Sequence, residues 1–133
     1  MGAPWIQEAE IDAVMLTDPA EPRSRPRRAA GLRRTGIAYI AAGAFNGGLL
    51  ARAVGEDARF NYRPAGPAVL AEHRQLSGLA SSHGVSLKAA ALQFVLRHPG
   101  VSPLVFGAAR PAEEEDIRLA AIPIPEAFWA AAE

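Results

Sequence analysis

The sequence contains no cysteine, a single lysine at position 88, and no apolar run long enough to cross a membrane. The absence of cysteine excludes disulfides and thiolate metal ligands and is consistent with a reducing compartment. A membrane-spanning helix needs about 20 consecutive apolar residues. The first residues also lack the basic and apolar regions of a signal peptide. These absences predict a cytoplasmic protein.

An excess of charge of either sign is also missing. The 133 residues include 14 basic and 14 acidic side chains, so no overall field favours nucleic acid or an anionic membrane. A hydrophobic content of 50% suits a chain that buries a core, and the length suits a single domain. His73, His83 and His98 have no carboxylate at metal-ligand spacing, so we predict packing or surface histidines and no metal site.

Residues 85–111 predict a helix, a buried strand and the start of a second helix. Residues 87–97 have the spacing of a helix with one buried face, and the following His-Pro-Gly ends it. Residues 101–106 are a short apolar run typical of a strand. Gly107 and two alanines then lead to a helix that opens at Pro111. Ligands of α/β proteins bind at the carboxyl ends of strands, where a helix N-terminus attracts anions such as phosphate.

Two other apolar runs predict strands earlier in the chain. Residues 11–16 form the first, and residues 36–44 contain the second. The second run ends in Phe45-Asn46-Gly47-Gly48, whose small residues let backbone approach a ligand closely.

Further helices are predicted at residues 69–83 and 126–132, with Ser86 capping the helix between them. The buried residues that these patterns predict are Val69, His73, Leu76, Ala80, Ala91, Leu92, Val95, Leu96, Phe128 and Trp129. Two connections look irregular: residues 18–35, rich in proline and arginine, and residues 51–67, a long loop that could serve as a lid or cofactor strap.

The motifs FNGGLL, VLAEH, HGVSLKAAALQFVLRHPGV, GAARP and IPIPEAFW occur in this order from residue 45 to residue 129. Their order and spacing resemble the C-terminal part of the aldo/keto reductases, most closely the L-fucose or D-threo-aldose dehydrogenase branch. The resemblance implies an α/β fold, a (β/α)8 TIM barrel of which residues 1–133 form one partial domain with the sixth to eighth strands. A whole barrel typically needs about 250 residues.

The same resemblance implies an oxidoreductase fragment that uses NAD(P) for hydride transfer on a sugar, aldehyde or ketone such as L-fucose. The family's catalytic Asp, Tyr, Lys and His come from earlier strands, so no catalytic residue is assigned here. We expect this chain alone to be inactive unless another polypeptide supplies the first five strands. The Pro/Arg-rich segment at residues 18–35 suggests a truncated gene or a slipped reading frame.

Cofactor binding is what the resemblance assigns to this chain. The residues implied to line the dinucleotide are Gly43, Ala44, Phe45, Asn46 and Gly48 at the pyrophosphate, Gly107, Ala108 and Arg110 at the adenosine, and Asp116 near the adenine. Glu113 stands where NADP-preferring members often carry Arg, and a carboxylate there disfavours a 2′-phosphate. NAD is therefore predicted over NADP. Ala42 and Ile117 also depart from the common Tyr and Asn.

A second class of function remains open at this point. The chain could be a non-catalytic α/β module or a degenerate pseudo-enzyme that self-associates. Unpaired strand edges, which barrel closure would hide, favour such association.

Overall fold

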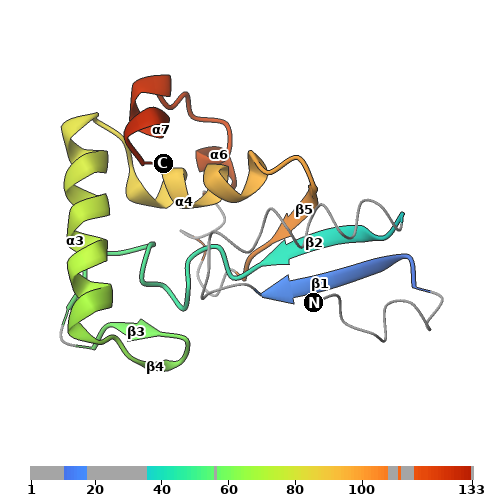
Figure 1. Cartoon of the computed structure of the whole chain (residues 1–133), viewed down its shortest axis with the longest axis horizontal. Coiled ribbons are helices and arrows are strands. Elements are labelled where there is room, and N and C mark those ends of the chain that lie inside the picture. The colour runs from blue at the N-terminus through green and yellow to red at the C-terminus, as the bar shows by residue number, and fades with distance from the viewer. Residues whose placement is uncertain (1–10, 18–35, 56, 108–110, 112–115, 133) are drawn as a thin grey trace.

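The computed structural model describes residues 11–17, 36–55, 57–107, 111 and 116–132. Within these ranges the protein is an α/β structure built on a parallel sheet of three strands, β1 (Ala13–Thr17), β2 (Ala38–Ala42) and β5 (Val101–Val105). The strands lie in the order β1-β2-β5, so β2 is central (Figure 1). All three strands predicted from the apolar runs are confirmed, with ends that differ by one or two residues.

The two faces of the sheet differ in burial. On β2, Tyr39 and Ala41 are buried, whereas Ala38, the first residue of the strand, is exposed. Partly buried residues of β1 and β5 join the covered face, where they pack with Leu92 and Val95 of the helix above. The other face carries Ala13, Met15, Ala38, Pro103 and Val105, all of them exposed. One face of the sheet is thus a packed core, and the described residues leave the other open.

Two consecutive helices, α3 (Pro67–Ser82) and α4 (Leu87–Leu96), form at the predicted places. Pro67 occupies the first turn of α3, where a missing N–H costs nothing. The chain leaves α3 through Gly84 at a φ of +64°, with the Val85 N–H donating to the Ala80 carbonyl and the Gly84 N–H to the Ser81 carbonyl. This is a Schellman ending, in which glycine relieves the strain of the left-handed residue.

Helix α4 starts as predicted, because the Ser86 hydroxyl accepts a hydrogen bond from the Ala89 N–H at 3.4 Å. Ala91, Leu92 and Val95 are buried, as the spacing predicts. The prediction was wrong for Leu96, which is 39% exposed, and likewise for Leu76 on the predicted stripe of α3, which is 38% exposed. Leu96 is the last helical residue, so its side chain lies beyond the part of the helix that the sheet covers.

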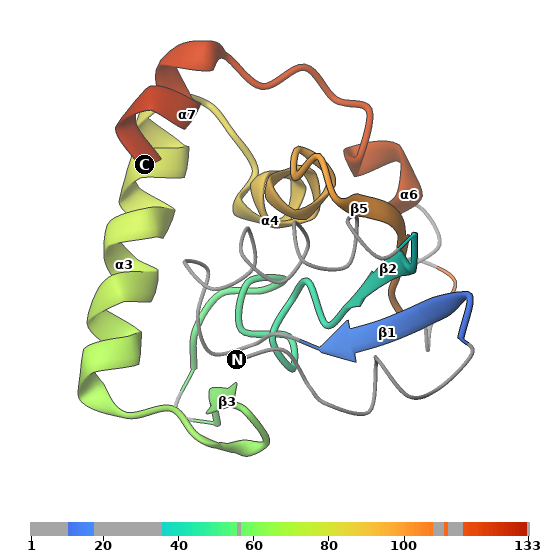
Figure 2. The same cartoon turned by 45° about the vertical axis from the view of Figure 1, so that its right-hand side comes forward.

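The C-terminal part adds α6 (Asp116–Leu119) and α7 (Glu126–Ala132). Phe128 and Trp129 are buried, which confirms that the final helix packs on the body. They form a second core cluster with Ala80 and Ala90, from α3 and α4. In Figures 1 and 2, α4 lies between the sheet and α3, and α7 lies beside one end of α3.

The prediction of a long loop at residues 51–67 needs correction. Two short antiparallel strands, β3 (Arg59–Phe60) and β4 (Arg63–Pro64), form a hairpin inside it. Asn61 and Tyr62 make the turn with φ values of +51° and +65°, the double left-handed geometry of a tight hairpin. Glycine usually fills the second position of such turns, so Asn-Tyr gave no turn signal in the sequence.

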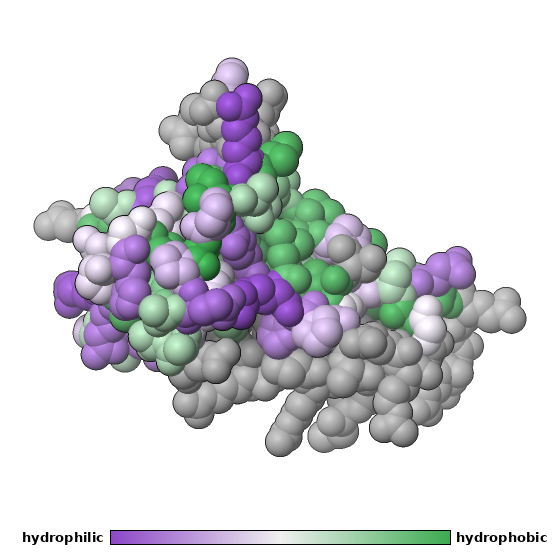
Figure 3. Space-filling model, turned by 90° about the horizontal axis from the view of Figure 1, so that it is seen from above, coloured by the Kyte–Doolittle hydropathy of each residue, from purple (hydrophilic) through white to green (hydrophobic). Residues whose placement is uncertain are grey.

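Residues 18–35, predicted to be an irregular connection, lie outside the described residues. No helix in the described ranges is long and apolar enough to span a membrane. From above, hydrophobic residues gather near the middle of the molecule, and hydrophilic residues prevail on the left, the side of α3 (Figure 3).

Candidate functional site

Two segments meet beyond the carboxyl end of the sheet. One is the turn that follows β2, residues 43–50, and the other is the segment of Phe106 and Gly107 that follows β5. The rings of Phe45 and Phe106 contact edge to face, with centroids 6.1 Å apart. Because β2 and β5 are parallel neighbours, their carboxyl ends share one edge of the sheet. The structure thus brings together the predicted residues of the first segment and Gly107 of the second.

The turn after β2 is held by its own backbone hydrogen bonds. The Asn46 N–H donates to the Gly43 carbonyl at 2.9 Å, and the N–H groups of Gly48 and Leu50 both donate to the Phe45 carbonyl at 3.0 and 3.2 Å. These amides are already paired and do not serve as ready donors to a phosphate. The positive charge that would favour an anion at this turn therefore comes from nearby cationic side chains.

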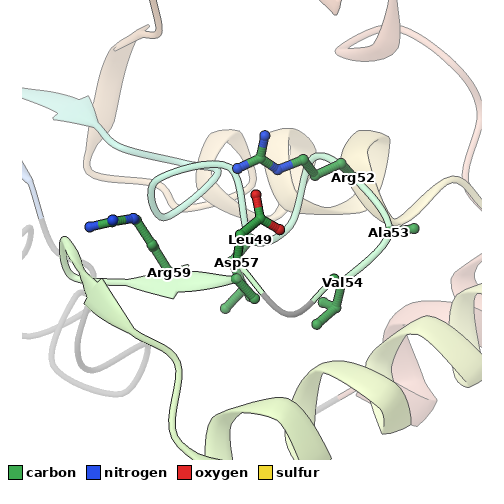
Figure 4. Close-up of a pocket in the computed structure, with 8 residues that line it drawn as sticks. Leu49, Arg52, Ala53, Val54, Asp57 and Arg59 are labelled. Atoms are coloured by element: carbon green, nitrogen blue, oxygen red, sulfur yellow. The ribbon is translucent and has the colours of Figure 1, made fainter.

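Arg52 is the first such cation. Its guanidinium packs over Gly48, where an added Cβ would lie 3.7 Å from the guanidinium carbon. In Figure 4, Arg52 and Asp57 both contribute to the wall of a small pocket beside this turn. That pocket holds about 10 Å³, which is room for about one water and not for a cofactor. Arg52 was not predicted from the sequence, because no spacing rule relates it to the glycines.

Lys88 is the second cation. It lies in the first turn of α4, with its ammonium 5.6 Å from the centre of the Phe45 ring. The same ammonium forms an ion pair with the carboxylate of Asp116, which is nearly buried. The sequence predicts Lys88 in the first turn of a helix but indicates no function for it. The fold puts it between the turn after β2 and α6, so it joins two segments predicted to contact the cofactor.

The structure describes only some of the remaining predicted residues. Asp116 lies at the start of α6, and its neighbour Ile117 is 65% exposed. Ala108, Arg110 and Glu113 lie outside the described residues. The structure therefore describes the predicted site at the turn after β2, at Gly107 and at Asp116.

Asn46 ties the turn to the hairpin. Its side-chain oxygen accepts a hydrogen bond from the Asn61 N–H at 3.2 Å, across 15 residues of chain. The hairpin within residues 51–67 is thus anchored to a residue predicted to bind cofactor. This contact is compatible with the strap role considered for this segment, which stays a prediction.

The tyrosines do not form an acid–base site with Lys88 and Asp116. Tyr39 belongs to the core under α4, and Tyr62 is 88% exposed at the tip of the hairpin. The described residues contain no group of three or more His, Asp or Glu side chains that could hold a metal ion. His83 and His98 pack against aromatic rings, and His73 is buried.

The chain matches known proteins along most of its length. The sequence profile of the aldo/keto reductase family matches residues 13–133. A pyridoxal 4-dehydrogenase from Microbacterium luteolum is 36% identical over 101 residues, which cover 73% of this chain and 29% of that enzyme. A D-threo-aldose 1-dehydrogenase from Pseudomonas sp. is 33% identical over 134 residues, covering 94% of this chain and 40% of the relative.

Solved structures agree on the fold. An aldo-keto reductase from Bacillus halodurans matches with a TM-score of 0.66 in its apo form and 0.65 in its holo form, at 18% identity. Each match covers 93% of this chain, but only 43% and 42% of that structure. The chain therefore spans less than half the length of these relatives. From the profile match over residues 13–133, this chain belongs to the aldo/keto reductase family.

Proposed function

We propose that this chain supplies the dinucleotide-binding segment of an NAD(P)-dependent oxidoreductase. The observation that carries the proposal is the meeting of the turn after β2 with the segment after β5, joined by the contact between Phe45 and Phe106. Members of the family bind a dinucleotide and a substrate. In this proposal Gly43, Ala44, Phe45, Asn46 and Gly48 line the pyrophosphate, Gly107, Ala108 and Arg110 the adenosine, and Asp116 the adenine.

Arg52 provides the positive charge that the pyrophosphate needs. The amides of Asn46, Gly48 and Leu50 are used within the turn, and the Arg52 guanidinium lies over Gly48. A guanidinium holds phosphate oxygens through charge-assisted hydrogen bonds. Lys88 is already paired with Asp116, so it contributes less free charge than Arg52.

The open face of the sheet supports a partial barrel. Its exposed residues are almost all apolar, for example Met15 and Val105, which are 59% and 48% exposed. In a (β/α)8 barrel one face of every strand points to the closed interior and the other to the helices. We assign β1, β2 and β5 to the sixth, seventh and eighth strands, with the open face as the barrel interior.

The reaction we assign to the completed enzyme is hydride transfer on a sugar, aldehyde or ketone. The bound nicotinamide would supply the hydride chemistry. Tyr39 is buried in the core and Tyr62 is exposed at a hairpin tip, so in this proposal the residue that moves the proton lies outside residues 1–133. The relatives are named as a pyridoxal dehydrogenase and an aldose dehydrogenase. These names support a small polar substrate whose alcohol or aldehyde carbon exchanges the hydride.

A cofactor titration tests the binding role. We expect saturable binding of NADH to the purified chain, followed by fluorescence, and an affinity about ten-fold lower in Arg52→Gln, since one charge-assisted contact is lost. Arg74→Gln, an exposed arginine on α3, is the matched control and should leave the affinity unchanged. Failure of NADH to bind the wild-type chain at all would contradict the proposal.

The same assay tests the preference for NAD. Glu113 stands where NADP-preferring members of the family often carry Arg, so a 2′-phosphate would lose a cation and meet a carboxylate, and NADPH should bind more weakly than NADH. Tighter binding of NADPH would refute this preference.

Activity is tested by complementation. The chain mixed with a polypeptide that holds the first five strands of an aldose dehydrogenase relative should form NADH from NAD and L-fucose, whereas neither part alone should.

One observation favours a second candidate, a non-catalytic module that self-associates. The sheet's described edges at β1 and β5 are unpaired and its open face is apolar. Size-exclusion chromatography with light scattering separates the candidates. A concentration-dependent dimer that does not bind NADH would favour the second, and a monomer that binds NADH would favour the first.

A further inference from the structure

Lys88 lies between two segments that the proposed function gives to the dinucleotide. Its ammonium forms an ion pair with the carboxylate of Asp116 and lies 5.6 Å from the centre of the Phe45 ring. This separation is within the range of a cation–π contact, which extends to about 6 Å. One side chain of α4 thus contacts both the first residue of α6 and the turn after β2.

The geometry of that turn depends on Phe45. Its carbonyl accepts hydrogen bonds from the N–H groups of Gly48 and Leu50, at 3.0 and 3.2 Å. Its ring contacts the Phe106 ring edge to face and also lies beneath the Lys88 ammonium. A shift of Phe45 would therefore lengthen both hydrogen bonds and move the backbone of the turn at Gly48.

Helix α6 is held against α4 at two places. The side-chain amide of Gln93 donates to the carbonyls of Leu119 and Ile122, at 2.8 and 2.7 Å. The ion pair between Lys88 and Asp116 holds the start of α6, and Gln93 holds its end. Because α6 is held at both ends, the Asp116 carboxylate is a fixed anchor for the Lys88 ammonium.

Another ion pair, at the end of α4, provides a contrast. The side chains of Arg97 and Glu126 are 46% and 79% exposed. Those of Lys88 and Asp116 are only 24% and 10% exposed. Water and salt screen an exposed pair strongly and a largely buried pair much less, so the second pair keeps more of its attraction. Arg97 also contacts the ring of Trp129 on α7, and not the turn after β2.

We propose that Lys88 is a positioning residue of the cofactor site, which holds Phe45 and the turn after β2 in the form that receives the pyrophosphate. Asp116 acts through Lys88 by fixing its ammonium over the Phe45 ring. This role rests on the proposed function, because it concerns the turn that binds the dinucleotide there. Lys88 itself does not bind phosphate, since its charge is used by the carboxylate and the ring.

Hydrogen exchange in the ligand-free chain, followed by NMR, tests the positioning directly. In Lys88→Met the Gly48 and Leu50 amides should exchange about five-fold faster, because the carbonyl that accepts from both is held less firmly. The Val85 amide, which donates to the Ala80 carbonyl at the end of α3, should exchange at an unchanged rate. Lys88→Arg keeps the charge and should restore the wild-type rates. Unchanged rates at Gly48 and Leu50 in Lys88→Met would overturn the proposal.

Titration of the same variants with NADH separates positioning from direct binding. Lys88→Met and Asp116→Asn should each weaken NADH about five-fold. The double variant should also lose about five-fold, and not the roughly 25-fold of two independent contacts. If Lys88 bound phosphate directly, Asp116→Asn would free its charge and strengthen NADH binding, which would overturn the proposal. Arg97→Gln breaks the exposed ion pair of α4 and, as the control, should leave the affinity unchanged.

The two measurements distinguish failure of this role from failure of the proposed function. A wild-type chain that does not bind NADH contradicts the proposed function, and the exchange rates then decide whether Lys88 holds the turn. A wild-type chain that binds NADH no more tightly than Lys88→Met contradicts the positioning role and leaves the proposed function intact. Circular dichroism checks that each variant folds. The double variant leaves neither charge unpaired, so it replaces Lys88→Met in both measurements if the single variant does not fold.

Discussion

The two sides of α4 are packed to different degrees. Toward the sheet, Leu92 and Val95 join a core cluster with Tyr39 and are almost fully buried. Away from the sheet, Ala91 and Phe94 border a cavity of about 290 Å³ between α3, α4 and α7. The same helix therefore meets a closely packed partner on one side and an incompletely filled one on the other. The sheet side of α4 is therefore where a truncated side chain should cost most, whereas the α3 side retains a cavity that a larger side chain can fill.

The largest expected effect is on the sheet side. Leu92→Ala removes a side chain that is 1% exposed, and leaves a cavity that the sheet cannot close. We expect the free energy of unfolding to fall by about 3 kcal/mol, measured by urea denaturation with circular dichroism. A loss below about 1 kcal/mol would show that the sheet side is as loosely packed as the other.

A pair of alanines on α4 tests the contrast directly. Ala89 is 1% exposed and does not line the cavity, whereas Ala91 does. Ala89→Leu should lower the free energy of unfolding by about 2 kcal/mol, because the extra carbons have no space. Ala91→Leu should raise it by about 1 kcal/mol, because the leucine enters the cavity and buries apolar surface. Equal destabilisation by the two substitutions would contradict the cavity.

A smaller effect on the free energy of unfolding is expected at the start of α4. Ser86→Ala removes the hydroxyl that accepts from the Ala89 N–H, and should cost about 1 kcal/mol in thermal or urea unfolding. Ser81→Ala, at an exposed position in the last turn of α3, is the control and should be neutral or slightly stabilising, since alanine is the better helix former. A cost at position 81 equal to that at 86 would argue against the cap.

An effect of similar size, but dependent on salt, is expected where α4 meets α7 at the surface. Arg97 contacts Glu126 at 3.1 Å and lies 4.6 Å from the centre of the Trp129 ring. Arg97→Gln should lower the free energy of unfolding by about 1 kcal/mol at low salt, because it loses an exposed ion pair and a cation–π contact. Glu126→Gln removes the ion pair and the negative charge at the start of α7 but keeps the cation–π contact, so it should cost less, and its cost should vanish in high salt. A salt-independent cost for Glu126→Gln would contradict this division.

The strands and helices were largely readable from sequence because each carries a local signal. Ser86 caps α4, Pro67 starts α3, and the three apolar runs are strands. The hairpin was missed because Asn61-Tyr62 adopts a turn usually signalled by glycine. The contacts of Arg52 with Gly48 and of Lys88 with Asp116 were not readable either, since they join segments that only the fold brings together. The cofactor assignments from family resemblance remain predictions.

By itself, the sequence determined the order of the three sheet strands and of helices α3, α4 and α7, the small-residue turn after β2, the buried face of α4 as far as Val95, and the absence of thiol chemistry, because each follows from local spacing or composition. Tertiary structure decided which segments meet: Phe45 with Phe106, Lys88 with Asp116, Asn46 with the hairpin, and α3 with α4 around a cavity. These contacts depend on strand order and helix packing in three dimensions. The spacing of residues along a chain indicates which face of a helix or strand is buried and where the element ends. It does not give the distance between two elements that pack together in the fold.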